Sequence, residues 1–203
     1  MTDSVTDRKV NATQKKIIAQ LDARAAYEHE KNADNASIQK TIAELASFAH
    51  EHVARAFCIA NVDLSIINRQ QRVNARTNVY ALQKLFADAR VCANVITAKV
   101  NHYSKHIVLS AASFAEADTV FTRDDASYSC SNVHTHSDKA KARLINRYDS
   151  AIADNTVTTQ LSSSIESLIQ MSVLEEFRTD SNKRAYRICD NENAQNFLSA
   201  CNK

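Results

Sequence analysis

The chain of 203 residues contains no glycine, no proline and no tryptophan. At average usage of about 7% glycine and 5% proline, the chance that a chain of this length lacks both is on the order of 10⁻¹¹. Chance is therefore excluded, and two explanations stay open. Either the chain is so helical that it needs no special turns, or it was built from a restricted amino-acid alphabet. We hypothesise a natural sequence rebuilt without these three residues.

The lack of glycine changes which residues must occupy left-handed backbone positions. Asparagine and aspartate tolerate positive φ best among the remaining residues, so we expect them at helix ends and turns. Asparagine does occur at the places where the apolar period breaks, namely Asn32, Asn35, Asn61, Asn101, Asn155 and Asn182. Glycine-rich phosphate-binding loops cannot exist in this chain, which excludes the P-loop and dinucleotide-binding fingerprints.

Charge and hydropathy limit the remaining function classes. The formal net charge of +2 gives no overall nucleic-acid signature, so such a function would need local basic patches. No apolar run reaches the roughly 18 residues of a membrane span, and the N-terminus lacks the apolar core of a signal peptide. The five cysteines form no CxxC pair. We therefore expect reduced thiols, a cytoplasmic location and no membrane partner.

Apolar periodicity predicts a mainly α-helical fold. Amphipathic stretches at about 8–31, 38–57 and 64–100 predict an N-terminal helical region over 1–121, suited to dimerisation. The segment 107–121 fits either a helix or a short strand followed by a helix. Residues 122–137 lack helical periodicity and predict a loop or hairpin. Residues 138–203 then predict a C-terminal module with a short β-hairpin.

The C-terminal third resembles the winged-helix DNA-binding domain of bacterial regulators. Over about 138–190 it offers helices at 138–148, 149–154 and 157–171, then strands at 173–178 and 184–189 around the polar turn TDSNK. Ile165, Leu168, Ser172, Val173 and Leu174 fit the pattern that closes many recognition helices, with Ser172 where glycine is usual. A residue at that point is often held at positive φ.

The resemblance implies a recognition helix at about 157–171 and a wing at about 173–189. In such domains the helix enters the major groove and the wing touches the backbone or minor groove. The residues that it implies at DNA are Thr158, Thr159, Gln160, Ser162 and Ser163 on the helix and Arg178, Lys183, Arg184 and Arg187 on the wing.

A second basic patch lies upstream. The predicted recognition helix contains no Lys or Arg, although phosphate neutralisation supplies much of the affinity of DNA-binding proteins. Arg69, Arg72 and Arg76 recur at i, i+3 and i+7, which would put three guanidinium groups on one helical face. In a homodimer this face could supply the missing charge. A solvated helix surface is the alternative interpretation.

One loop carries metal-ligating residue types. The stretch VHTHSD with the following NRYD is similar to the signature of JAMM metallopeptidases. The resemblance implies that His134, His136 and Asp149 hold zinc and activate water. The alternative interpretation is that His134 and His136 are an isolated H-x-H pair in a polar loop and bind no metal.

Together these patterns favour one function over two others. We predict sequence-specific binding of duplex DNA by a homodimeric regulator, without catalysis or cofactor. The first alternative is a helical scaffold or protein-interaction protein with a structural hairpin, and the second is a zinc-dependent JAMM-like hydrolase.

Overall fold

The computed structural model describes residues 5–68, 75–131, 135–146 and 157–203 of the chain. As predicted, the fold is mainly helical, with a small antiparallel sheet in its C-terminal part. Among the described residues, no helix combines the length and the apolar character that a membrane crossing would require.

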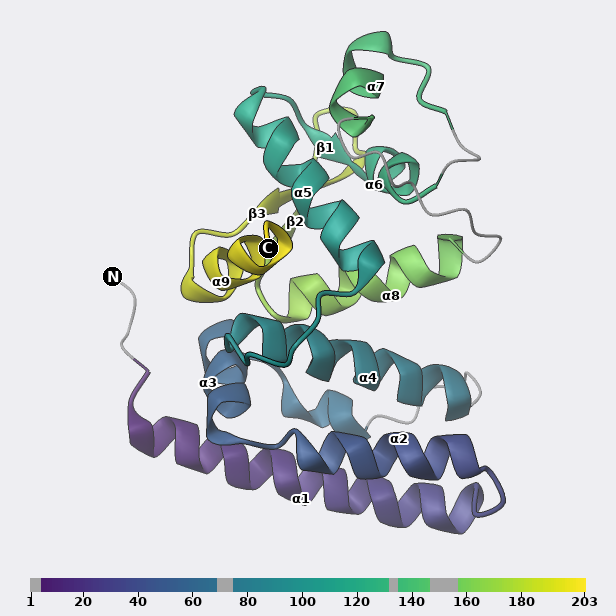
Figure 1. Ribbon diagram of the computed structural model, residues 1–203, viewed down its shortest axis with the longest axis vertical. Helices are drawn as coiled ribbons and strands as arrows, with labels where there is room; N and C mark the ends of the chain where they lie inside the picture. Colours follow the sequence, from purple (N-terminus) through teal and green to yellow (C-terminus); the bar gives the residue numbers. More distant parts are fainter. Residues whose placement is uncertain (1–4, 69–74, 132–134, 147–156) are drawn as a thin grey trace.

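The N-terminal half is a stack of helices at one end of the molecule (Figure 1). The long first helix packs against the next two helices and against a 3₁₀ turn. The elements of this half are α1 (Asp7–Lys31), α2 (Ala36–Ser47), α3 (Glu51–Ala60), η1 (Leu64–Asn68) and α4 (Ala75–Cys92).

The C-terminal half builds a three-stranded antiparallel sheet with helices around it. The strands lie in the order β1-β3-β2, so the last strand in sequence occupies the centre of the sheet. The elements of this half are α5 (His102–Glu116), β1 (Phe121–Thr122), α6 (Arg123–Ser129), α7 (Lys139–Ile145), α8 (Val157–Gln170), β2 (Leu174–Arg178), β3 (Arg184–Ile188) and α9 (Glu192–Cys201).

Helix α4 joins the two halves. It packs against α2 and α3 on one side and against α8 and α9 on the other (Figure 1). The buried side chains form one continuous cluster, which includes Phe57 against Phe86 at a ring-centroid distance of 5.4 Å and Phe114 against Phe121 at 5.1 Å. The position of α8 is therefore fixed by both halves of the molecule.

Asparagine and aspartate take the left-handed positions, as expected for a chain without glycine. The described residues with positive φ are Asn61, Asn94, Asp118, Ser172 and Asn182. Asn61, Asn94 and Asp118 each follow a helix whose end is closed by the paired backbone hydrogen bonds of a Schellman motif. Asn182 lies in the turn of the β2–β3 hairpin. Of the asparagines at predicted breaks, Asn61 and Asn182 have the expected positive φ. Helix ends also lie at Asn32, Asn35 and Asn101, but with negative φ, and Asn155 lies outside the described residues.

Ser172 closes α8 at a φ of 51°, which confirms the positive φ expected from the sequence. The N–H of Val173 donates to the carbonyl of Leu168 over 2.8 Å, and the N–H of Ser172 donates to the carbonyl of Ile169 over 2.9 Å. These two bonds form a Schellman motif, whose left-handed residue is usually glycine. A Cβ at this position costs about 1 kcal/mol.

Several predicted elements need correction. The stretch predicted as one helix at 38–57 is broken between α2 and α3, where the chain turns at residues 48–50. The stretch at 64–100 holds η1 and then α4, which ends at Cys92. Ile96, which continues the apolar period of this stretch, lies beyond that end and is 100% exposed. The left-handed Asn94 terminates the helix before the apolar period can carry Ile96 inward.

The loop predicted over 122–137 is partly wrong, because α6 forms within it. The seven residues of α6 are too few to display an apolar period, and its signal is instead a capping box between Thr122 and Asp125. At 107–121 the structure has a helix followed by a strand, the reverse of one predicted order.

The predicted division at residue 121 also cuts through a packed unit. Strand β1 pairs with β3, and α5 packs against both α8 and β3, so these elements belong with the C-terminal sheet. The helix predicted over 138–148 is the shorter α7, and the one predicted over 149–154 lies outside the described residues.

Candidate functional site

Helix α8 presents three different faces. Its core face is apolar and packs into the C-terminal half, through Val157, Leu161, Ile165 and Leu168. A second face carries Thr158, Thr159 and Ser162, which are exposed. The third face lies against α4, so Gln160 and Ser163 are only half-buried rather than free for a partner. The five residues predicted at DNA are therefore divided between the exposed face and the α4 contact.

Arg123 supplies a cation beside the exposed face of α8. It is the first residue of α6, and its Nη2 donates to the Ser162 hydroxyl over 2.7 Å. The same hydroxyl donates to the Thr158 carbonyl one turn earlier over 3.0 Å. Sequence patterns gave no reason to select Arg123, because it lies in the segment predicted as a loop. The structure thus brings a guanidinium to a helix that has no Lys or Arg of its own.

The four cations predicted on the β2–β3 hairpin are all exposed: Arg178, Lys183, Arg184 and Arg187. Two of them pair across the strands. Arg187 Nε lies 2.9 Å from Glu175 Oε2, and Arg184 Nε lies 3.7 Å from Glu176 Oε1. The Arg187 hydrogen bond lowers the pKa of Glu175 below its ordinary value.

The tip of the hairpin gathers positive charge. Arg178 stands directly opposite Arg184 in the strand register, and Lys183 is the adjacent residue. Like charges at directly opposed positions of an antiparallel pair destabilise the sheet. Arg178 also donates from Nη1 to the Asn182 carbonyl over 3.0 Å, which holds its guanidinium at the turn. Arg178, Lys183 and Arg184 are hereafter the hairpin-tip cations.

A buried polar network fastens α8 to α4. Asp88 is fully buried, and its Oδ2 accepts from Ser167 Oγ over 2.6 Å and from Ser104 Oγ over 3.4 Å. Its Oδ1 has no hydrogen-bond partner in the described part of the chain. Burial raises the pKa of Asp88 to about 7, although the Ser167 hydrogen bond opposes this shift. The carboxyl therefore titrates close to neutral pH.

Lys84 lies one helical turn before Asp88 on α4 and points at α8. Its Nζ donates to the Gln160 carbonyl over 3.0 Å, to Ser163 Oγ over 2.7 Å and to Ser164 Oγ over 3.0 Å. Burial lowers the pKa of this ammonium to about 8, with a smaller opposing effect from Asp88. No local pattern in the sequence links these residues, because the contact joins two helices far apart in the chain.

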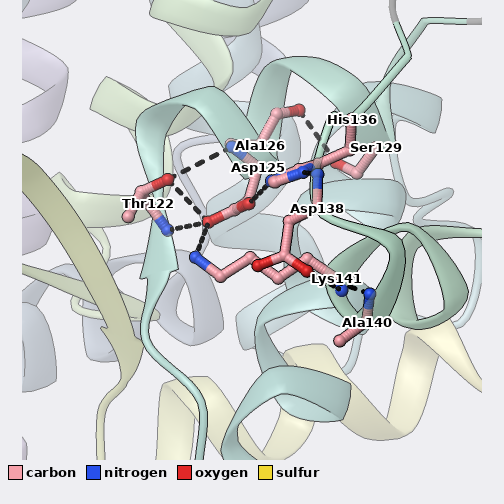
Figure 2. A network of polar contacts seen from close by, with 8 residues as sticks. All are labelled: Thr122, Asp125, Ala126, Ser129, His136, Asp138, Ala140 and Lys141. Atoms are coloured by element: carbon pink, nitrogen blue, oxygen red, sulfur yellow. Dashed lines mark hydrogen bonds and ion pairs between the residues drawn. The ribbon is translucent and has the colours of Figure 1, made fainter.

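The histidine loop forms a hydrogen-bond network around Asp125 (Figure 2). His136 Nε2 lies 2.6 Å from Asp125 Oδ1, and His136 Nδ1 accepts from the Asp138 N–H over 3.0 Å. The buried Asp125 also accepts from the backbone and hydroxyl of Thr122 and lies 3.6 Å from Lys141 Nζ. Both ring nitrogens of His136 are therefore occupied, and the network ties residues 136–141 to the start of α6.

The remaining members of the predicted metal site, His134 and Asp149, lie outside the described residues. Within the described ranges, no three His, Cys, Asp or Glu side chains are grouped as metal ligands would be. Cys130, near this loop, is buried, and burial raises the pKa of its thiol to about 11.

The three arginines predicted on one helical face lie mostly outside the described residues. Arg69 and Arg72 lie outside the described residues, and Arg76 falls in the first turn of α4, where side chains are not described.

Comparisons of the chain with protein-family models, with curated proteins and with solved structures found no match. The candidate site is therefore defined by its own geometry.

Proposed function

We propose that the chain binds duplex DNA in a sequence-specific manner, without catalysis. The binding surface is the exposed face of α8, with Arg123 beside it, and the hairpin that follows. A helix continued directly by a β-hairpin is the arrangement that the resemblance to winged-helix domains implies. Helix α8 would be the helix in the major groove and the β2–β3 hairpin the wing. The preceding helix that the resemblance places at 149–154 lies outside the described residues.

The observation that carries this proposal is the contact between Arg123 and Ser162. Arginine binds phosphate through a planar donor fork, and phosphate contacts fix the register of a protein on the duplex. Serine and threonine hydroxyls can donate to or accept from base edges. A guanidinium within 2.7 Å of a Ser162 hydroxyl combines both kinds of group on one exposed surface.

The hairpin-tip cations support the same proposal. Arg178 lies opposite Arg184, whose charge Glu176 partly balances at 3.7 Å, and a bound phosphate would be an acceptor for both guanidinium groups. A homodimer, with two such surfaces on successive half-sites, is part of the proposal.

Selection from a pool of duplexes with a random central segment tests the proposal. The wild-type chain should enrich one motif, and should bind it at least about 10³-fold more tightly than a scrambled duplex. Lack of any enrichment, together with lack of binding to labelled duplex at low salt, would contradict it and favour the protein-interaction scaffold.

A further inference from the structure

A cavity lies where α4 meets α8. It encloses about 490 Å³, within the range of pockets that hold small molecules. The N-terminal half lines it with the apolar side chains of Ile66, Leu82 and Leu85, and α8 lines it with hydroxyl groups that include Thr159 and Ser163. The cavity thus has an apolar wall facing a polar wall, which suits a ligand with both characters.

Lys84 brings positive charge to this cavity. The residue lines it, together with Gln160 and Ser163, which accept two of its hydrogen bonds. All three oxygens that it contacts within hydrogen-bond distance are neutral. Among the described residues, no carboxylate is paired with its Nζ within 4.0 Å. Within the described ranges the half-buried ammonium therefore forms no ion pair, and the carboxyl group that acts on it electrostatically is Asp88, one helical turn away.

The other charged groups around the cavity restrict the ligand. Arg24 also lines it, but its guanidinium is already paired with Glu28 at 2.7 Å. Asp88, one turn after Lys84 on α4, is fully buried, and burial raises the pKa of its carboxyl to about 7. Glu166 lines the cavity as well and would repel a second negative charge on a ligand.

We propose that this cavity binds a small monocarboxylate with an apolar body. The carboxylate replaces Ser163 Oγ as one of the three acceptors of the Lys84 ammonium, and the released Ser163 hydroxyl donates to it. The body lies against Ile66, Leu82 and Leu85. Binding neutralises a desolvated cation, so the charge of the ligand contributes to affinity as well as its apolar surface. Thr158, Thr159 and Ser162 of the proposed DNA surface also line the cavity. The inference is still tested apart from DNA binding, because carboxylate binding is measured on the protein alone.

Isothermal titration calorimetry with octanoate tests the site, with 1-octanol as the uncharged counterpart. The wild-type chain should bind one octanoate per chain, at least about tenfold more tightly than 1-octanol. Lys84→Met should weaken octanoate binding about tenfold or more and leave 1-octanol binding unchanged. Lys99→Met, which removes an exposed lysine from the α4–α5 linker, should change neither affinity.

A second variant keeps the test decisive if Lys84→Met fails to fold. Ala81 is exposed and lines the cavity, so Ala81→Phe fills the space without disturbing the core. It should abolish the binding of both compounds while thermal unfolding stays near that of the wild type. The proposal is overturned if the wild type shows no saturable octanoate binding, or binds 1-octanol equally well. Unchanged octanoate affinity in either folded variant, Lys84→Met or Ala81→Phe, also overturns it.

Discussion

The guanidinium of Arg123 donates a hydrogen bond to the hydroxyl of Ser162 over 2.7 Å, and so links the first residue of α6 to the exposed face of α8. This contact puts a permanent cation next to a helix without Lys or Arg. The exposed face of α8 and the start of α6 thereby form one surface, on which we propose that DNA binds.

Removal of the Arg123 charge should weaken DNA binding at all sequences alike. Arg123→Gln keeps a donor for Ser162 and loses one phosphate contact, so the salt dependence of the binding constant should fall by about one in slope. Fluorescence anisotropy with labelled duplex over a range of salt concentrations measures both effects. Arg8→Gln, which removes an exposed arginine from α1, is the matched control and should behave as the wild type.

The hairpin tip should contribute in the same way. Replacing both Lys183 and Arg184 with alanine should lower affinity for every duplex and reduce the salt slope by about one to two. The double replacement of Lys15 and Lys16, which are exposed on α1, removes the same number of charges far from α8. If the two double variants bind DNA equally well, the hairpin makes no contact with DNA.

Replacement of Ser172 with glycine should stabilise the fold. The φ of 51° strains a residue with a Cβ, and glycine removes that strain of about 1 kcal/mol. Greater freedom of glycine in the unfolded chain offsets part of the gain, and so does loss of the 3.4 Å hydrogen bond from Ser172 Oγ to the Ala60 carbonyl.

Ser172→Ala is the matched control, because it loses the same hydroxyl and keeps the Cβ. Thermal and urea unfolding should therefore rank the glycine variant above the alanine variant by about 1 kcal/mol. An alanine variant as stable as the glycine variant would mean that the backbone at residue 172 is not held at positive φ.

Asp88 should make stability depend on pH in a defined direction. Burial raises its pKa from 3.8 to about 7, so the folded state favours the protonated carboxyl. The protonated Asp88 stabilises the fold fully below about pH 4. As pH rises from about 4 to 7 this contribution is lost, and the free energy of unfolding falls by about 2–4 kcal/mol. Lys84, with a pKa lowered to about 8, acts in the opposite sense between about pH 8 and 10.5.

Urea unfolding between pH 4 and 7 measures the Asp88 contribution. Asp88→Asn cannot ionise, so its free energy of unfolding should not show the fall that the wild type shows. The variant should therefore become more stable relative to the wild type as pH rises. Asp22→Asn, at an exposed position on α1, should follow the wild-type pH profile. A pH-independent difference between wild type and Asp88→Asn would contradict the assignment.

The sequence predicted those elements whose signals are local. The apolar period predicts α1 and α8 within about two residues, and alternation predicts β2 and β3 on either side of a polar turn. Left-handed positions without glycine also follow from local backbone chemistry, and the positive φ expected at Ser172 is confirmed. Two-residue β1 and seven-residue α6 were missed because they are too short to show a period.

Contacts between distant segments were beyond sequence patterns. Arg123 and Ser162 are 39 residues apart, and Lys84 and Ser163 are 79 apart. Each pair forms because two packed helices bring exposed or half-buried polar residues together. Hydropathy patterns do not predict which polar residues of two helices will meet. For the same reason the sequence predicted Gln160 and Ser163 at DNA, whereas α4 partly covers them.

The salt dependence of duplex binding by the wild-type chain tests the central claim most directly. Binding to a labelled random-sequence duplex should weaken linearly on a log–log plot between about 50 and 200 mM salt. Arg123 and the hairpin-tip cations predict a slope of about −3 to −4 for each bound chain. A chain that remains folded and does not bind duplex at 50 mM salt, or binds with a slope near zero, would contradict the claim that this surface recognises DNA.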